Sequence, residues 1–190
     1  MYKAFYGLTK DPFPKGVEIK DFFKSKEFTE ALNRLEFLKN TKGFGLITGE
    51  PTQFLKNLIL DDLRIIFNFE MDSKDYAILV LVGQVPFITQ LNRQPHEALR
   101  QKIVINYNLQ GLTKDEVKDY IVFSLKNAGC SEPIFTDDAF KLLFSSTNGF
   151  LRKINRLAKM CLIAGASQKL KSINSEIVFR AQSEINITAK

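Results

Sequence analysis

The chain has 190 residues, of which 45% are hydrophobic and 25% are charged. These values are ordinary for a soluble globular protein, and the length allows one good core or two small ones. No apolar run approaches the ~20 residues of a membrane-spanning helix. Residues 1–5 also lack the apolar core of a signal peptide. We therefore expect a cytoplasmic protein without a membrane partner.

Charge, histidine and cysteine content limit the chemistry further. Lys and Arg number 27 against 21 Asp and Glu, a formal net charge of +6. This charge permits contact with DNA but does not require it, because a basic surface can simply be solvated. The only histidine, His96, excludes a Ser-His-Asp triad and is expected at a helix start. Cys130 and Cys161 lack metal-ligand spacing, so we expect small core residues and predict no metal site.

The first half of the chain alternates helices with apolar strands. Aromatic and turn-forming residues at 6–14 predict an ordered arm. A helix is predicted over 25–40, with one apolar face made of Phe28, Leu32, Leu35 and Leu38. A buried strand is expected at 44–48 and a second helix over 53–70. The unbroken apolar run 77–83 is typical of a parallel sheet that is covered on both faces.

The rest of the sheet region is short, and the pattern after it is helical. A short helix that contains residues 97–101 leads to a third expected strand, 103–109. From Gly111 onward the pattern is helical only. Thr113 and Glu116 have the spacing of a capping box, in which each side chain bonds the other residue's backbone N–H.

Three further helices complete the second half. Thr136 is expected to cap one of them, with Phe135 and Phe140 forming a hydrophobic staple. Longer helices are expected over 151–168 and 175–185.

The change of pattern at Gly111 is the best domain boundary. We therefore predict an N-terminal arm and α/β core in residues 1–110, and an all-helical domain in residues 111–190.

A phosphate-binding loop begins after the first expected strand. Gly49-Glu50-Pro51 follows the strand as the opening of a Walker A motif, G-x-x-x-x-G-K-[ST], does. Counted from Gly49, the second Gly, the Lys and the Ser/Thr belong at positions 54 to 56, where the chain has Phe, Leu and Lys. It therefore lacks the glycine, the lysine for the β- and γ-phosphates and the hydroxyl for Mg²⁺.

The shortening is concentrated at one point, directly after this loop start. Gln53-Phe54-Leu55 matches the tail of a Walker B segment without its acidic residues, which hold Mg²⁺ and orient the attacking water. A five-stranded P-loop sheet needs roughly 150 residues. The span from Phe44 to Leu109 supplies three strands.

These pieces together resemble the AAA+ ATPases of the ExeA/TniB group, which includes MuB-like transposition helpers. The resemblance covers nearly the whole chain. It rests on five segments in order: 6–13, 47–51, 81–84, 99–103 and 148–155. It implies a fold in which strands 1, 4 and 5 remain in the order 5-1-4. This gives a truncated three-stranded parallel sheet flanked by helices, followed by a small all-helical lid domain.

The resemblance also assigns site positions. Gly49, Glu50 and Pro51 are the remnant of Walker A, Gln84 takes the sensor 1 position, and Arg152 takes the sensor 2 position that reaches the nucleotide phosphates. Arg100 or Lys102 falls where the family offers an arginine finger to a neighbouring subunit. Relatives often have arginine at the latter position. Lysine lacks the planar fork, which weakens that assignment.

Simpler interpretations stay open for each position. Gly49 can serve only a turn that needs a permissive backbone. Arg152, Lys153, Arg156 and Lys159 can form a solvated helix face rather than a contact with phosphate or DNA.

The family role is ATP binding and hydrolysis with Mg²⁺, coupled to transposition or secretion assembly. Without the missing residues we expect ATP and Mg²⁺ binding to be weak or absent and hydrolysis to fail. A remaining role would be binding of DNA, a transposase or full-length AAA+ relatives. Two alternatives are a subunit that lends an arginine finger in a mixed ring, and a non-functional mobile-element remnant. Residues 77–83 become an apolar sheet edge, which predicts marginal stability or self-association.

Overall fold

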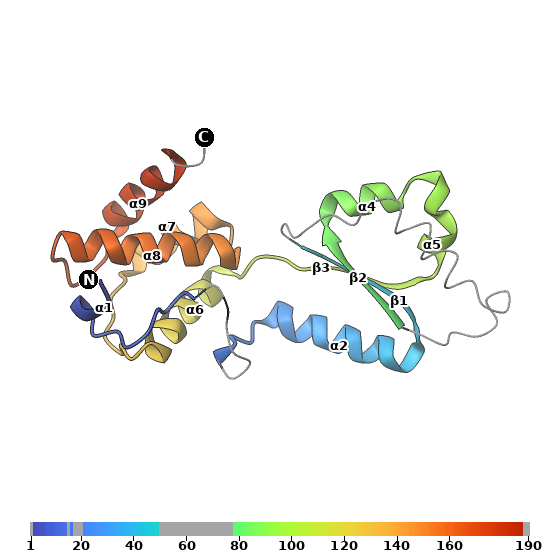
Figure 1. Ribbon diagram of the computed structural model, residues 1–190, viewed down its shortest axis with the longest axis horizontal. Helices are drawn as coiled ribbons and strands as arrows, with labels where there is room; N and C mark the ends of the chain where they lie inside the picture. Colours follow the sequence, from blue (N-terminus) through green and yellow to red (C-terminus); the bar gives the residue numbers. More distant parts are fainter. Residues whose placement is uncertain (1, 15, 17–20, 50–77, 188–190) are drawn as a thin grey trace. The chain divides into compact units, whose positions relative to one another are not determined.

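The computed structural model describes residues 2–14, 16, 21–49 and 78–187 (Figure 1). The chain divides into two compact units. The sheet unit comprises residues 26–110, and the helical unit comprises residues 1–25 together with residues 111–190.

The sheet unit contains three parallel strands among its described residues. These are β1 (Gly43–Gly49), β2 (Ile78–Gln84) and β3 (Ile103–Asn108), in the order β2-β1-β3. The register of β1 and β2 runs without a break from Gly43 opposite Ile78 to Gly49 opposite Gln84. This arrangement confirms the predicted order 5-1-4. Among the described strands, β2 pairs only with β1.

Helices lie on both faces of this sheet (Figure 1). One face carries α2 (Lys26–Thr41), whose Leu38 is almost fully buried. A Cβ at Gly45 would come within 2.7 Å of the Leu38 side chain, so the glycine in β1 allows the close approach of α2. Leu32, which the helical spacing placed inward, is 48% exposed.

The other face is covered by the segment that connects β2 to β3. It consists of α4 (Val85–Leu91), the 3₁₀ helix η3 (Gln94–His96) and α5 (Glu97–Gln101). His96 is the N-cap residue of α5, as expected. The buried core on this face comprises Phe44, Leu46, Leu81, Phe87, Leu91 and Leu99.

Strand β2 has one covered and one uncovered row of side chains. Leu81 is 3% exposed, whereas Ile78, Val80 and Val82 are 41%, 38% and 55% exposed. Side chains alternate between sheet faces along a strand, so these three form one apolar row. The predicted helix over 53–70 lies outside the described residues.

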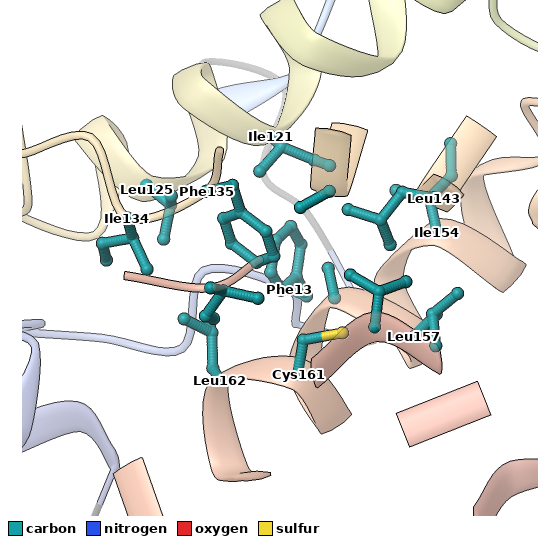
Figure 2. Close-up of a cluster of buried hydrophobic side chains, with 14 of the residues drawn as sticks. Phe13, Ile121, Leu125, Ile134, Phe135, Leu143, Ile154, Leu157, Cys161 and Leu162 are labelled. Atoms are coloured by element: carbon teal, nitrogen blue, oxygen red, sulfur yellow. The ribbon is translucent and has the colours of Figure 1, made fainter. Parts of the chain in front are cut away.

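The helical unit is built from one short and four longer helices among its described residues. These are α1 (Tyr2–Phe5), α6 (Lys114–Asn127), α7 (Asp137–Thr147), α8 (Leu151–Ser167) and α9 (Ser175–Ile187). The two cysteines are buried in their shared core, as predicted. Figure 2 shows Cys161 in this core among residues of α6, α7 and α8.

Helices α6 and α7 begin at the predicted residues. Thr136 is the N-cap residue of α7, but its hydroxyl donates to the carbonyl of Ile173 at 3.1 Å and makes no capping bond. The backbone N–H of Thr113 donates to the Glu116 carboxylate at 3.0 Å, and the Thr113 hydroxyl accepts from the backbone N–H of Glu116. At α7, the rings of Phe135 and Phe140 lie 5.8 Å apart. Both the capping box and the hydrophobic staple are therefore confirmed.

The N-terminal arm packs with the helical unit, which differs from the expected grouping of residues 1–110. Tyr6, Leu8 and Phe13 belong to the helical core, and Figure 2 shows Phe13 within it. The Tyr6 hydroxyl donates to the carbonyl of Leu170 at 2.9 Å, and Thr9 N–H donates to the carbonyl of Ala128 at 2.7 Å. The aromatic side chains of the arm are therefore buried in the core of the helical unit, and polar groups of the arm form hydrogen bonds with that unit.

Candidate functional site

The carboxyl edge of the sheet brings together two of the predicted site residues. Gly49 ends β1, and its register partner in β2 is Gln84, the residue at the sensor 1 position. Carboxyl ends of parallel strands form the edge at which open α/β sheets bind ligands. Glu50 and Pro51 lie outside the described residues.

A buried polar pair lies beside Gly49 at this edge. Thr48 is fully buried, and its hydroxyl donates to the Asn108 side-chain oxygen at 3.1 Å. The carbonyl of Thr48 accepts from the N–H of Leu109 at 2.7 Å. Sequence reasoning did not single out Asn108. The sequence signal that could have identified Asn108 is an amide side chain at the end of the third strand, opposite a threonine in the first. The bond joins β1 to β3 and leaves the Thr48 hydroxyl occupied within the protein.

Gly49 itself is under no backbone constraint. It is not among the glycines with positive φ, and an added Cβ would meet Leu109 at an ordinary 3.5 Å. A turn that requires a glycine at this position therefore does not explain its presence. Alanine would fit in the same backbone.

Arg100 and Lys102 lie at the opposite, amino-terminal edge of the same sheet. The carbonyl of Lys102 accepts from the N–H of Phe44, near the start of β1. Strands rise about 3.3 Å per residue, so the length of β1 separates this edge from Gly49 by roughly 20 Å. The two groups of predicted site residues are therefore not brought together within the sheet unit.

The arginine-finger candidates differ in their surroundings. The Arg100 side chain is 47% exposed, and its guanidinium lies 3.8 Å from the Glu97 carboxylate, one turn earlier in α5. The Lys102 ammonium lies 6.0 Å from the ring centroid of Phe44. Arg100 is thus the more exposed of the two, and a surface ion pair at this spacing contributes little to stability.

Arg152 belongs to the helical unit, near the start of α8. Arg152, Lys153 and Arg156 are exposed, and Lys159 forms an ion pair with Asp11 of the N-terminal arm. Burial alone would raise the pKa of Asp11. The hydrogen bonds from Lys159 and from Phe13 N–H outweigh burial, and the pKa lies below its usual value.

The helical unit also contains a cavity of about 360 Å³ that sequence reasoning did not anticipate. Its wall includes Phe22, Phe23, Tyr120 and Phe123, and Asn155 contributes a polar group. The Tyr120 hydroxyl donates to the Asn155 side-chain oxygen at 2.6 Å, and burial raises the pKa of this tyrosine. Lys10, Asp11 and Asp21 also line the cavity, so its wall combines aromatic, amide and charged side chains.

Within the described ranges, no three His, Cys, Asp or Glu side chains gather as a metal site would require. Nor does any helix there have the length and hydropathy to cross a bilayer.

No protein-family model matches the chain. General secretion pathway protein A of Aeromonas hydrophila is 38% identical over 116 residues. The chain is a homologue of this protein. The match covers 60% of the chain, and the chain spans 21% of that relative's length.

Solved structures place this homologue in a fold class. The Thermotoga maritima RuvB Holliday junction branch migration motor matches 94% of the chain with a TM-score of 0.56 and 16% identity, over 74% of its own length. Aeropyrum pernix ORC1, solved in complex with DNA, matches 97% of the chain with a TM-score of 0.51 and 17% identity, over 47% of its own length. At these identities the likeness concerns the fold. Together with the three parallel strands and the helices after them, it identifies a truncated AAA+ fold.

Proposed function

We propose that this homologue of General secretion pathway protein A binds a partner without hydrolysing ATP. The observation that carries the proposal is the chemistry of the carboxyl edge of the sheet. Its strand ends offer Gly49, Gln84 and Asn108, which carry no charge. Hydrolysis needs a lysine or arginine on the phosphates and acidic residues on Mg²⁺.

The sequence beyond Gly49 supports the same conclusion. Phe54, Leu55 and Lys56 occupy the positions of the Walker A glycine, lysine and hydroxyl residue, and no Asp-Glu pair precedes Gln53. A lysine one position late does not replace a lysine at the required spacing. ATP and Mg²⁺, which relatives of this fold imply for the family, are therefore expected to bind weakly or not at all.

The binding role falls mainly to the helical unit. The candidate partners are DNA, a transposase or full-length AAA+ relatives, in a transposition or secretion process in the cytoplasm. Two similar proteins support the secretion and DNA classes without deciding between them. One relative is a secretion-pathway protein, and one structural neighbour was solved with DNA.

The direct test measures turnover and affinity on the full chain. Radiolabelled ATP should be hydrolysed at the background rate with Mg²⁺ present, and Arg152→Ala should give the same rate. Titration calorimetry with Mg·ATP should give a Kd weaker than about 1 mM, which corresponds to about −4 kcal/mol. Slow turnover that disappears in Arg152→Ala would overturn the proposal.

A second candidate function is an in-trans contribution to a neighbouring ATPase. The favouring observation is Arg100, which is exposed and loosely paired at the sheet edge away from Gly49. In a mixed ring with an intact AAA+ relative, this guanidinium would stabilise charge on that subunit's transferring phosphate. Stimulation of the relative's ATPase should be lost in Arg100→Ala and kept in Arg93→Ala, an exposed arginine earlier in the same connection. Equal stimulation by both variants would remove this candidate.

A further inference from the structure

The chain passes between its two units at two places. The sheet unit comprises residues 26–110, so the first connection lies at residues 25–26 and the second at residues 110–111. A unit that is inserted in this way stays attached through both of its ends. Contacts that hold these ends therefore decide how the connections can move, because a hinge is a few residues whose backbone torsions change.

Within the sheet unit, one carboxylate joins the two ends. Glu27 lies in the first turn of α2, next to the first connection, and Gln110 is the last residue of the unit. The Oε2 atom of Glu27 accepts from the Tyr107 hydroxyl at 2.7 Å and from the backbone N–H of Gln110 at 3.3 Å. We call these three residues the Glu27 clamp.

Helix α2 also holds the ring of Tyr107. The Arg34 guanidinium lies 4.5 Å from the centroid of this ring, and Arg34 Nε lies 2.8 Å from the Glu30 carboxylate. Burial and, next in size, the hydrogen bond to Glu27 raise the pKa of Tyr107 to about 12. The hydroxyl therefore stays protonated at neutral pH and remains a donor. The same helix thus contacts the tyrosine at its ring face and at its hydroxyl.

The backbone before Gln110 is fixed to the sheet. The N–H of Leu109 donates to the carbonyl of Thr48 at 2.7 Å, which continues the pairing of β3 with β1 beyond Asn108. Gln110 is the next residue, and its N–H donates to the Glu27 side chain. The Glu27 clamp therefore extends the ordered backbone to the end of the unit.

The backbone after Gln110 is fixed to the helical unit. An added Cβ at Gly111 would lie 2.2 Å from the carbonyl oxygen of Asn148, so the two backbones are in close contact. The N–H of Leu112 donates to the carbonyl of Gly149 at 2.8 Å. With Leu109 held on one side and Gly111 on the other, the second connection has its freedom at Gln110.

A simpler role for Glu27 would be to stabilise its own helix. An acidic residue in the first turn interacts favourably with the helix macrodipole. That role needs no contact outside the helix, whereas the Glu27 carboxylate accepts from donors 80 and 83 residues away in the chain. Its position therefore indicates a contact between the two ends of the unit.

From these contacts we infer that the Glu27 clamp controls a hinge between the two units. It fastens the second connection to the start of α2, so that the sheet unit turns on both connections together and neither opens alone. The clamp uses only groups of the chain itself, so it acts with or without a nucleotide. The inference is independent of the proposed absence of hydrolysis.

The first test is amide hydrogen exchange in the full chain, followed by NMR. Glu27→Ala should speed exchange at the Gln110 N–H by at least about tenfold, because the acceptor is lost. Exchange at the Leu109 N–H should change less than about twofold, since its acceptor is the Thr48 backbone. Tyr107→Phe should give a smaller increase at Gln110, because the carboxylate remains.

The second test is ¹⁵N relaxation of the same samples. Glu27→Ala should shorten the rotational correlation times of both units, because two bodies that reorient more independently tumble faster than one combined body. The matched control is Glu36→Ala, on the exposed side of α2, where Glu36 pairs with Lys39 at 3.4 Å. It should leave both correlation times and the exchange of Gln110 as in the wild type.

Three results would overturn the inference. An equal rise in exchange at Leu109 and Gln110 would mean that Glu27→Ala loosens β3 as a whole. Unchanged correlation times in Glu27→Ala would mean that the hydrogen bonds are local and control no hinge. The same changes in Glu36→Ala would mean that only the loss of an acidic side chain matters.

Urea titration should show that each variant stays folded. If Glu27→Ala does not fold, Glu27→Gln gives the same two measurements, because it keeps the size of the side chain and removes the charge that strengthens both hydrogen bonds. The same directions of change are expected, and their absence would reject the clamp.

Discussion

The helical unit and the sheet unit differ most in how much apolar surface they bury. Among the described residues, the helical core gathers 23 buried residues and the sheet core six. The sheet also leaves the apolar row of Ile78, Val80 and Val82 at the surface. Buried apolar area is the main favourable contribution to folding, so the helical unit should be the more stable of the two.

This difference has a functional meaning. In an AAA+ fold the sheet holds the phosphates and the helical lid reports on them. Here the larger core and the N-terminal arm belong to the helical unit. At the carboxyl edge of the sheet, the strand ends Gly49, Gln84 and Asn108 are uncharged, and the Glu27 carboxylate accepts from the N–H of Gln110 just beyond β3. The proposed binding role of the helical unit is compatible with a three-stranded sheet, because it does not require the phosphate and Mg²⁺ ligands of an ATPase.

The largest expected effect comes from truncating each core. Ile154→Ala should lower the free energy of unfolding of the helical unit by about 3 kcal/mol, because it removes a fully buried side chain and leaves a cavity. Leu91→Ala should destabilise the sheet unit and leave the helical transition unchanged. Urea unfolding followed by circular dichroism should show two transitions. A single transition shifted by both variants would contradict the separation of stabilities.

Replacing one glycine in each unit should also change the free energy of unfolding of the two units by different amounts. Gly149 has φ of +74°, and an added Cβ would lie 2.0 Å from the carbonyl oxygen of Leu112. Gly149→Ala should therefore cost about 2–3 kcal/mol from strain and steric conflict.

Gly49→Ala in the sheet unit is the control, because an added Cβ there has ordinary contacts. We expect a change within about 0.5 kcal/mol in the same urea titration. A large effect of Gly49→Ala would mean that the end of β1 is more constrained than its contacts indicate.

Asp11 tests how the N-terminal arm is attached to the helical unit. Its carboxylate pairs with Lys159 and accepts from Phe13 N–H at 3.0 Å. Asp11→Asn should destabilise the unit by about 1–2 kcal/mol at pH 7, the lower part of the range for charged hydrogen bonds, because the pair is partly solvated.

The pH dependence of this effect has a definite sign. The folded pKa of Asp11 is lowered, so its stabilisation is complete above the unfolded pKa of about 3.9 and is lost as the pH falls through the folded value. The difference between wild type and Asp11→Asn in urea midpoint should therefore shrink below about pH 4. The exposed Asp119→Asn should show neither effect, and a pH-independent difference for Asp11→Asn would reject the ionic contribution.

The smallest effect on stability is expected at the apolar row of β2. Val82→Lys changes an exposed side chain and should alter the free energy of unfolding by less than about 0.5 kcal/mol. It should reduce apolar dye binding and any self-association in analytical ultracentrifugation, since charge on an edge strand opposes pairing. Val122→Lys, at a 49% exposed site in the helical unit, is the control.

The β2 result also bears on the non-functional-remnant alternative. A broad melt with strong dye binding that neither lysine variant changes would favour a remnant. A sharp helical transition with dye binding confined to the β2 row would argue against one.

Sequence patterns predicted the elements that depend on nearby residues. The strand around Leu46, the capping box of Thr113 and Glu116, and the staple of Phe135 and Phe140 were all expected and are present. Each depends on side chains within a few positions of one another, so periodicity and capping rules apply directly. The sheet order was also expected, but through the family resemblance rather than through these rules.

Sequence patterns failed to predict other features, and the physical reasons can be identified. Helix α4 has the sequence Val-Pro-Phe-Ile-Thr-Gln-Leu, in which β-branched residues give a weak helical signal. It forms because Phe87 and Leu91, one turn apart, are buried in the sheet core. Leu32 has helical core spacing, yet no neighbouring element covers it fully.

The sequence by itself determined the three strands and the longer helices of the helical unit, and it predicts that the residues for ATP hydrolysis are missing. These properties follow from local side-chain chemistry and spacing. Only the tertiary structure decided that the arm around Phe13 packs in the helical core. It also decided that Gly49 pairs with Gln84 while Arg100 lies at the opposite edge of the sheet. The hydrogen bond from the Thr48 hydroxyl to Asn108 was likewise visible only in the structure. These pairings join residues far apart in the chain, so only packing could select them.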